Sequence, residues 1–268
     1  MINNSAGSQG QHSFGLTNLL GTWVNVNDRP DYISCFELVP SHEAELVLKI
    51  LSTSNQSEQP RLHLDVYPVA SPGSELAAGF YHCRQAGLII AANEKNGVLV
   101  LQCYRQQDAV LTREFYYRKE GAYGEVPPLT GKIVGEVTAA ENWPGQHIRI
   151  SEDFQALAGC WQNTYCQSRW MKAFSVEKTR SGWMLEIAGD CNGVAWPAMP
   201  LMPYYFDHRE MGFVACCDLA RTYGLFCAYS NKGLMVVSIF FIDKDMAPGQ
   251  TANKSFCREF YAKQPGIR

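Results

Sequence analysis

Two short strings each occur twice in this chain, in the same order and far apart. Leu20–Asn25 (LGTWVN) returns as Ala158–Asn163 (AGCWQN), and Arg113–Tyr116 (REFY) returns unchanged as Arg258–Tyr261. The second tryptophan follows the first by 138 residues (positions 23 and 161), and the second arginine follows the first by 145 (positions 113 and 258). Two unrelated strings repeated at nearly equal spacing indicate one unit written twice. Each copy is expected to open on Gly-x-Trp and to close on Arg-Glu-Phe-Tyr.

The repeat divides the chain into four predicted segments. Residues 1–14 are polar and rich in Gly, Ser and Asn, which predicts a disordered tail. Residues 15–120 and 151–268 are predicted to be the two copies. Residues 121–150 contain several prolines and glycines and are predicted to be a linker, whose length favours an ordered crossing or a functional loop.

Composition limits the classes of function. The chain has 268 residues, 46% of them hydrophobic, which is enough for one or two domains with their own cores. A net charge of −3 gives no electrostatic argument for nucleic acid or an anionic membrane. No run approaches the roughly 18 apolar residues of a membrane span, and the N-terminus has no secretory signal pattern. The sequence therefore predicts a cytoplasmic protein with no nucleic-acid partner and no membrane span.

The ten cysteines are predicted to be reduced and mostly buried rather than paired in disulfides. Most of them lie in apolar, strand-like runs, and no secretory signal accompanies them. No Cys or His spacing typical of a zinc site is present, and neither is a Gly-rich phosphate loop or a nucleophile elbow. We expect neither a metal nor an organic cofactor.

Short β-like runs separated by turn residues fill both copies, at the spacing typical of an all-β sandwich or barrel. In the first copy the expected strands are 20–26, 33–39, 45–51, 61–67, 77–82, 87–93, 98–105 and 111–118. In the second they are 158–164, 169–178, 183–189, 193–199, 203–208, 211–217, 223–229, 234–242 and 255–262. Asn96-Gly97 predicts a tight hairpin, with a counterpart at residues 230–233. A helical turn is expected before each Gly-x-Trp, at 16–20 and 151–158.

The Gly-x-Trp at the head of each first strand, answered by an Arg on the last strand, resembles the pattern of the lipocalins and the wider calycin superfamily. The resemblance implies two antiparallel up-and-down β-barrels in tandem, related by pseudo-two-fold packing. It also implies that each tryptophan closes one barrel end beneath the last-strand arginine, which would pair Trp23 with Arg113 and Trp161 with Arg258. Carriers, inhibitors, chromophore lyases and a few cofactor-free cyclases and isomerases share this architecture, so the fold does not select among them.

The second copy is the richer of the two in aromatic and thioether side chains, which suit an apolar ligand in a barrel. An ordinary aromatic core explains most of them equally well. Tyrosine hydroxyls could also orient a ligand carbonyl, although interfacial tyrosines are the simpler alternative. The predicted ligand-binding residues are Trp183, Trp196, Met199, Met202, Tyr204, Tyr205 and Tyr165.

Acid and base groups follow the same part of the chain. His208 is the candidate general base or acid, with Asp207 or Glu210 tuning it, unless the segment is simply a solvated turn. Asp190 and Asp218 are flanked by apolar residues, and a carboxylate inside a barrel could protonate an alkene, epoxide or carbonyl. A turn with neighbouring Gly and Asn is the alternative for Asp190. The predicted catalytic set is therefore His208, Asp207 and Asp190.

The first copy has a smaller polar set. His63, Asp65 and Tyr67 share one strand face by the two-residue period of a β-strand. Such a face is either turned into a barrel pocket or outward to solvent, and the pattern favours neither.

Three function classes remain open. The first is a cofactor-independent enzyme that holds a hydrophobic substrate in one barrel for a non-redox cyclisation or isomerisation in specialised metabolism. The second is a non-catalytic carrier of a small apolar ligand. The third is an interaction scaffold, with a homodimer as a further alternative. The sequence analysis favours the enzyme by a narrow margin and places its site in the second copy, from Trp183 to Asp218.

Overall fold

The structure is a computed structural model of the chain, and it describes most of both copies. The described residues are 19–28, 30, 33–41, 46–51, 61–68, 78–83, 88–95, 97–119, 152–168, 170–191, 193–205, 211–244 and 253–265. The predicted tail and the predicted linker lie outside these ranges. Within them the regular structure is β-strand apart from one 3₁₀ helix, η2 (Glu152–Leu157), which confirms the all-β prediction and the helical turn before the second Gly-x-Trp.

The first eight strands close into an antiparallel barrel. They are β1 (Gly21–Asn25), β2 (Cys35–Pro40), β3 (Leu46–Ile50), β4 (Arg61–Pro68), β5 (Ala78–Cys83), β6 (Leu88–Lys95), β7 (Val98–Arg105) and β8 (Val110–Arg118). Each strand pairs with the next, and β1 also pairs with β8, so neither end strand is left with an open edge. All eight strands lie where the alternation pattern predicts them, to within one or two residues.

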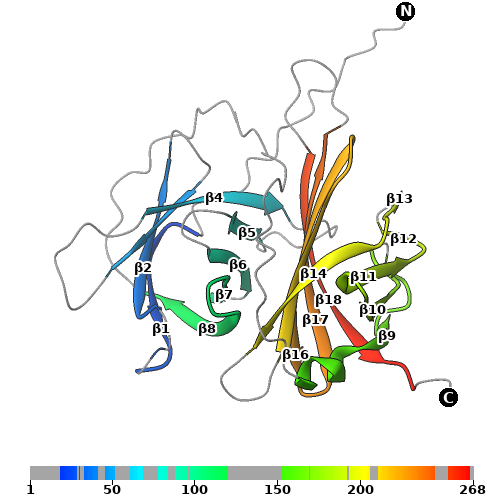
Figure 1. The fold of residues 1–268 in the computed structure, drawn as a ribbon. Helices are drawn as coiled ribbons and strands as arrows, with labels where there is room; N and C mark the ends of the chain where they lie inside the picture. The colour runs from blue at the N-terminus through cyan, green and yellow to red at the C-terminus, as the bar shows by residue number, and fades with distance from the viewer. Residues whose placement is uncertain are drawn as a thin grey trace, which may run out of the picture.

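The additional strands continue the sheet beyond β8. They are β9 (Gly159–Asn163), β10 (Ala173–Thr179), β11 (Gly182–Ala188), β14 (Met199–Tyr205), β15 (Met211–Asp218), β16 (Thr222–Asn231), β17 (Leu234–Asp243) and β18 (Asn253–Lys263). We call these eight strands the C-terminal sheet. Their order is β14-β11-β10-β9-β18-β17-β16-β15, and β14 also pairs with β15. A short parallel contact between β8 and β14 joins the sheet to the barrel, and Figure 1 shows the two parts side by side.

Two stretches of the second copy depart from the prediction, and in the first of them β10 begins at Ala173 rather than at 169. The expected strand 193–199 is reduced to β13 (Val194–Ala195), which pairs only with the two-residue β12 (Asp190–Cys191). The next strand, β14, begins at Met199 rather than 203 and includes Pro200 and Pro203. Proline lacks an N–H donor and usually marks a strand boundary, which is why sequence alone misplaces this one.

The two tight hairpins form as predicted. Lys95 pairs with Val98, which leaves a two-residue loop in which Gly97 has φ of +80°. Asn231 pairs with Leu234, and both loop residues between them have positive φ, +49° at Lys232 and +83° at Gly233. Two consecutive positive φ values define the turn whose twist matches an antiparallel hairpin.

The repeated tryptophans anchor the start of each first strand. Trp23 is 1% exposed, and its indole Nε1 donates a hydrogen bond to the Leu19 carbonyl at 2.9 Å. Trp161 is 4% exposed, and its Nε1 donates to the Leu157 carbonyl, also at 2.9 Å. Each indole therefore fills the core while its one polar atom is satisfied by the segment that precedes the strand.

Three further repeated residues of the first copy, Asn25, Glu114 and Tyr116, meet in one buried polar network. Asn25 Nδ2 donates to the Ile33 carbonyl at 3.0 Å. The Tyr116 hydroxyl lies 2.8 Å from that same carbonyl and 2.9 Å from Glu114 Oε2. Burial, and next the charge of Glu114, raise the pKa of Tyr116 far above its ordinary value, so the phenol stays neutral.

The second copy repeats this network. Asn163 Nδ2 donates to the Met171 carbonyl at 3.0 Å, and the Tyr261 hydroxyl lies 2.9 Å both from that carbonyl and from Glu259 Oε2. Burial and Glu259 raise the pKa of Tyr261 in the same way. The string Arg-Glu-Phe-Tyr is therefore repeated because its Glu and Tyr tie the last strand to the loop that follows the first.

The predicted contact between Trp23 and Arg113 is wrong. β1 and β8 do lie side by side, as expected, but their register places Trp23 opposite Arg118. Arg113 is five positions earlier on β8, and its side chain lies on the face opposite Glu114 and Tyr116.

The predicted contact between Trp161 and Arg258 is wrong for the same reason. Trp161 lies opposite Lys263, whose ammonium nitrogen is 5.8 Å from the centre of the indole ring. A cation does sit over this tryptophan, but it is supplied two residues beyond the repeated string.

Among the residues that the structure describes, buried hydrophobic side chains form three clusters. One fills the inner face of the barrel around Trp23, Phe36 and Tyr116. A second, which we call the inner cluster, fills the inner face of the C-terminal sheet around Trp161 and Phe174. The third, which we call the junction cluster, lies between the barrel and the C-terminal sheet. Its members are Tyr67, Ile89, Ala91, Tyr104, Leu111, Met202, Tyr204, Val214, Tyr223, Leu225, Cys227, Tyr229, Val236, Phe240, Ile242 and Phe256.

Candidate functional site

On the inner face of the C-terminal sheet, a group of aromatic side chains is the best candidate for a ligand site. Trp183 on β11 is 3% exposed and packs edge-on against Phe154 of η2, with ring centroids 4.7 Å apart. The ring of Tyr205, at the end of β14, lies 6.4 Å from that of Phe154. The 3₁₀ helix thus supplies a phenyl ring between two sequence-predicted ligand residues.

Trp183 has an unsatisfied polar atom. Its Nε1 is buried and has no hydrogen-bond partner in the structure. Leaving a buried donor unpaired costs about 1–3 kcal/mol, so such atoms call for an explanation. A guest molecule with a carbonyl, ether or hydroxyl oxygen would supply the missing acceptor.

Trp196 differs from Trp183 in this respect. Its Nε1 donates to the Cys191 carbonyl at 3.4 Å, and its ring packs edge-on against Phe226 and Phe241. A Cβ added at Gly224 would lie 2.6 Å from the Trp196 ring, so the glycine makes room for the indole. Trp196 is therefore a satisfied core residue, although it shares the inner face with Trp183 and Met199.

The remaining predicted ligand residues are not gathered at one place. Successive side chains of β14 alternate between faces, so Met199 packs in the inner cluster while Met202 and Tyr204 belong to the junction cluster. The Tyr204 ring lies 5.1 Å from that of Tyr104 on β7. Tyr165 is 61% exposed in the segment after β9. Four predicted residues therefore share the inner face: Trp183, Trp196, Met199 and Tyr205.

The structure does not test the predicted catalytic residues. Asp207 and His208 lie outside the described residues, and so does the side chain of Asp190. The backbone of Asp190 is in β12, beyond the end of β11 that pairs with Met199. The strand end that precedes Asp207 and His208 is Tyr205, at the other end of β14.

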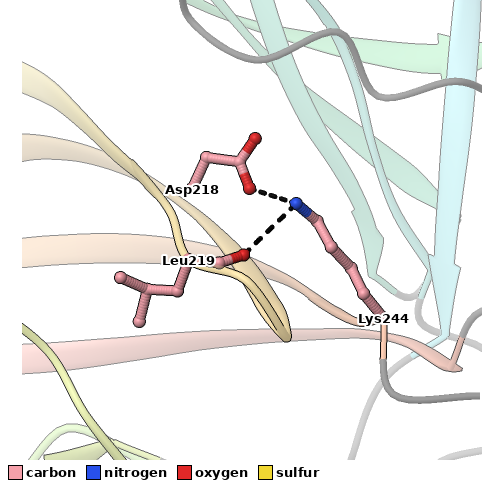
Figure 2. Close-up of polar contacts among 3 residues, drawn as sticks. All are labelled: Asp218, Leu219 and Lys244. Atoms are coloured by element: carbon pink, nitrogen blue, oxygen red, sulfur yellow. Dashed lines mark hydrogen bonds and ion pairs between the residues drawn. The ribbon is translucent and has the colours of Figure 1, made fainter.

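Asp218 is not an acid inside the barrel. It lies at the end of β15, where its carboxylate pairs with Lys244, the residue that follows β17. The same ammonium also donates to the Leu219 carbonyl, at 3.4 Å. Figure 2 shows both contacts of Lys244. The pair links the ends of β15 and β17, which lie on either side of β16, and the carboxylate is not placed to protonate a buried substrate.

Two of the three residues in the polar set of the first copy, Asp65 and Tyr67, contact the C-terminal sheet. Tyr67 is fully buried in the junction cluster, and its ring lies 5.3 Å from that of Phe240. Asp65 pairs with Lys254 of β18 at 3.1 Å. These residues join the barrel to the C-terminal sheet.

Phe154 is an inner-face residue beside Trp183 that sequence analysis missed. The helical turn that carries it was predicted, but a 3₁₀ helix has no apolar periodicity to show which side chain turns inward. Within the described residues, no three His, Cys, Asp or Glu side chains are grouped as a metal site would require, and no helix is long and apolar enough to cross a membrane.

Comparison with family models, curated proteins and solved structures finds no match for this chain.

Proposed function

We propose that the C-terminal sheet binds a small, largely apolar molecule that carries one hydrogen-bond acceptor. The observation that supports this most is the buried, unpartnered Nε1 of Trp183 among aromatic side chains. Apolar surroundings with one fixed polar group are typical of small-molecule sites. A β-barrel fold is compatible with such binding, and the acceptor would recover the cost of the unpaired indole donor.

The proposed binding is tested by removing the donor while retaining a ring. A suitable probe is β-ionone, an apolar ketone, titrated by native mass spectrometry against the wild type and Trp183→Phe. We expect the variant to bind about tenfold more weakly, because one hydrogen bond is lost. Trp196→Phe is the matched control, since that indole already has a partner, and it should change the affinity by less than about threefold.

A terpene hydrocarbon without oxygen separates the hydrogen bond from general packing. It should bind the wild type and Trp183→Phe alike, because it has no acceptor to lose. If both probes bind Trp183→Phe more weakly than the wild type, and by the same factor, the indole acts through its shape and the proposed polar contact is absent. If neither probe binds the wild type, the binding proposal itself is wrong.

We further propose that the C-terminal sheet is a second lipocalin-like barrel, formed by duplication of the first, with residues 15–120 and 151–268 as the two units. Support comes from the repeated strings, from the matching Trp, Asn, Glu and Tyr contacts, and from the β14–β15 pairing. Expression of residues 15–120 and of residues 151–268 as separate chains tests the boundaries. Cooperative unfolding of each would support two units, while an unfolded product from either would contradict them.

Catalysis at the same site is the second candidate, as a cofactor-free cyclisation or isomerisation. One observation favours it: Tyr205 packs against the inner cluster, and Asp207 and His208 lie two and three residues after it in the sequence. Turnover of polyene or terpenoid substrates by the wild type is compared with His208→Ala, Asp207→Asn and Asp190→Asn. Loss of turnover with retained binding in the first two supports catalysis, whereas tight binding without any turnover identifies a carrier.

A further inference from the structure

The two arginines of the repeated Arg-Glu-Phe-Tyr string meet the same tyrosine. The guanidinium carbon of Arg113 on β8 lies 4.7 Å from the ring centre of Tyr229 on β16. Arg258 on β18 donates a hydrogen bond from Nη2 to the Tyr229 hydroxyl at 2.7 Å. Two cationic groups, one from the barrel and one from the C-terminal sheet, thus converge on one side chain of the junction cluster.

Neither arginine has an acidic partner among the residues that the structure describes. The glutamates that follow them, Glu114 and Glu259, point to the opposite strand faces and are bound to Tyr116 and Tyr261. Both arginines are only partly exposed, and the Nε of Arg258 is buried without a hydrogen-bond partner. Two partly buried cations placed together without a counter-charge repel one another, and an anion would relieve that repulsion.

A buried amide donor completes the group. Gln102 on β7 is 1% exposed, and its Cα is the register partner of that of Arg113, so both side chains lie on the same face of the sheet. Its Oε1 accepts a hydrogen bond from the Tyr104 hydroxyl at 2.7 Å. Its Nε2 has no partner. The amide is therefore oriented by the tyrosine with its donor side unoccupied.

We propose that Arg113, Arg258, Gln102 and Tyr229 form an oxyanion-binding site between the barrel and the C-terminal sheet. The ligand group is a carboxylate or a phosphate. Both offer several acceptor oxygens to guanidinium forks, which bind such groups with two parallel hydrogen bonds. The Tyr229 hydroxyl accepts from Arg258, so its own proton remains available for the anion. This site is separate from the inner face that contains Trp183.

A purely structural role for the arginines explains less. Stacking accounts for Arg113 over Tyr229 and over Phe115, at 5.4 Å, and for Arg258 over Phe260, at 5.6 Å. It leaves Nε2 of Gln102 and Nε of Arg258 without hydrogen-bond partners inside the protein. A bound oxyanion accounts for the charges and the unpaired donors together.

Thermal unfolding of the full chain with inorganic phosphate or succinate tests the site, with chloride at equal ionic strength as the reference. We expect one or both oxyanions to raise the Tm of the wild type saturably, and the pair of titrations distinguishes phosphate from carboxylate. Arg113→Gln and Arg258→Gln should each weaken the apparent affinity by about tenfold or more, since each removes charge-assisted hydrogen bonds. Arg180→Gln, an exposed turn arginine, is the control and should respond as the wild type does. Equal responses to chloride and to both oxyanions would overturn the proposal.

A second measurement uses only the wild-type chain, so its result does not depend on whether a variant folds. Phenylglyoxal labels accessible arginines, and mass spectrometry maps the adducts on the wild-type chain. Saturating phosphate or succinate should lower labelling of Arg113 and Arg258 by fivefold or more and leave Arg180 unchanged. Uniform labelling of all three with and without the oxyanion would show that no such site exists.

Discussion

Lys232 adopts a backbone conformation that its side chain disfavours. It has φ of +49° in the hairpin between β16 and β17, where Asn and Gly are the usual residues. Its side chain is exposed, so no packing contact requires lysine at this position. The fold tolerates the free-energy cost of this positive φ because ten residue pairs hold the flanking strands β16 and β17 together.

We therefore expect Lys232→Asn to stabilise the protein, by about 0.5 kcal/mol, because asparagine tolerates the left-handed region better. The free energy of unfolding in urea measures the change. Lys172→Asn, at an exposed position outside the strands, is the control and should not stabilise. A destabilised Lys232→Asn would show that the turn conformation is not the limiting factor.

Cysteine reactivity also depends on single-residue environments. Burial, followed by the charge of Glu114, raises the pKa of Cys103 to about 12, and burial with Glu259 raises that of Cys191 to about 12. A thiol with so high a pKa is almost entirely protonated at pH 8, and the thiolate is the reactive form. Cys160 and Cys166 are exposed.

Iodoacetamide at pH 8 should accordingly alkylate Cys160 and Cys166 and spare Cys103 and Cys191 in the folded protein. Peptide mass spectrometry measures the adducts, and the same reaction in urea should label all four. Rapid labelling of Cys103 under native conditions would mean that the barrel core opens readily.

At the scale of the element, strand packing depends on residues that let backbones approach. Gly212 on β15 is such a position: a Cβ there would lie 2.3 Å from the Ala228 carbonyl oxygen and 2.6 Å from Cδ2 of Leu111. Leu111 belongs to β8 of the barrel. The glycine therefore permits both the β15–β16 pairing and the contact with the barrel.

Gly212→Val should destabilise the protein by about 1–3 kcal/mol, because the added side chain overpacks this contact. Denaturant unfolding measures the loss. Ala195→Val adds volume at an exposed strand position and should change the free energy of unfolding by less than about 0.5 kcal/mol. Equal effects of the two substitutions would contradict the close approach.

At the scale of the whole molecule, the junction cluster joins the two parts, and one ion pair lies across it. Lys254 of β18 is 9% exposed, pairs with Asp65 of β4 at 3.1 Å, and lies 5.5 Å from the centre of the Tyr67 ring. Asp65 itself is 43% exposed, so water screens the pair from one side.

A double-mutant cycle with Asp65→Asn and Lys254→Met should give a coupling free energy of about 0.5–1 kcal/mol that falls as salt is added. The Lys49–Glu37 pair within the barrel is the control. Its side chains are 33% and 37% exposed, so its coupling should be smaller. A junction coupling near zero at low salt would show that the apolar cluster alone holds the parts together.

Much of this architecture could be predicted from sequence because its causes are local. Alternation of apolar side chains placed the eight strands of the barrel, and Asn96-Gly97 and Lys232-Gly233 marked two hairpins. The candidate site was predicted in part: Trp183, Trp196, Met199 and Tyr205 share the inner face, while Phe154 was missed. Met202 and Tyr204 face away from the inner cluster because of where β14 begins. The two prolines of β14 hid that boundary from sequence analysis.

The sequence by itself determined the strand class, the repeat and the meeting of first and last strands, because each copy carries its own turns and its own pair of closing strings. Only the tertiary structure decided that Arg118 and Lys263 oppose the tryptophans, and that Arg113 and Arg258 converge on Tyr229. Register and contacts between distant strands depend on how whole faces pack, and no local pattern in the chain specifies that packing.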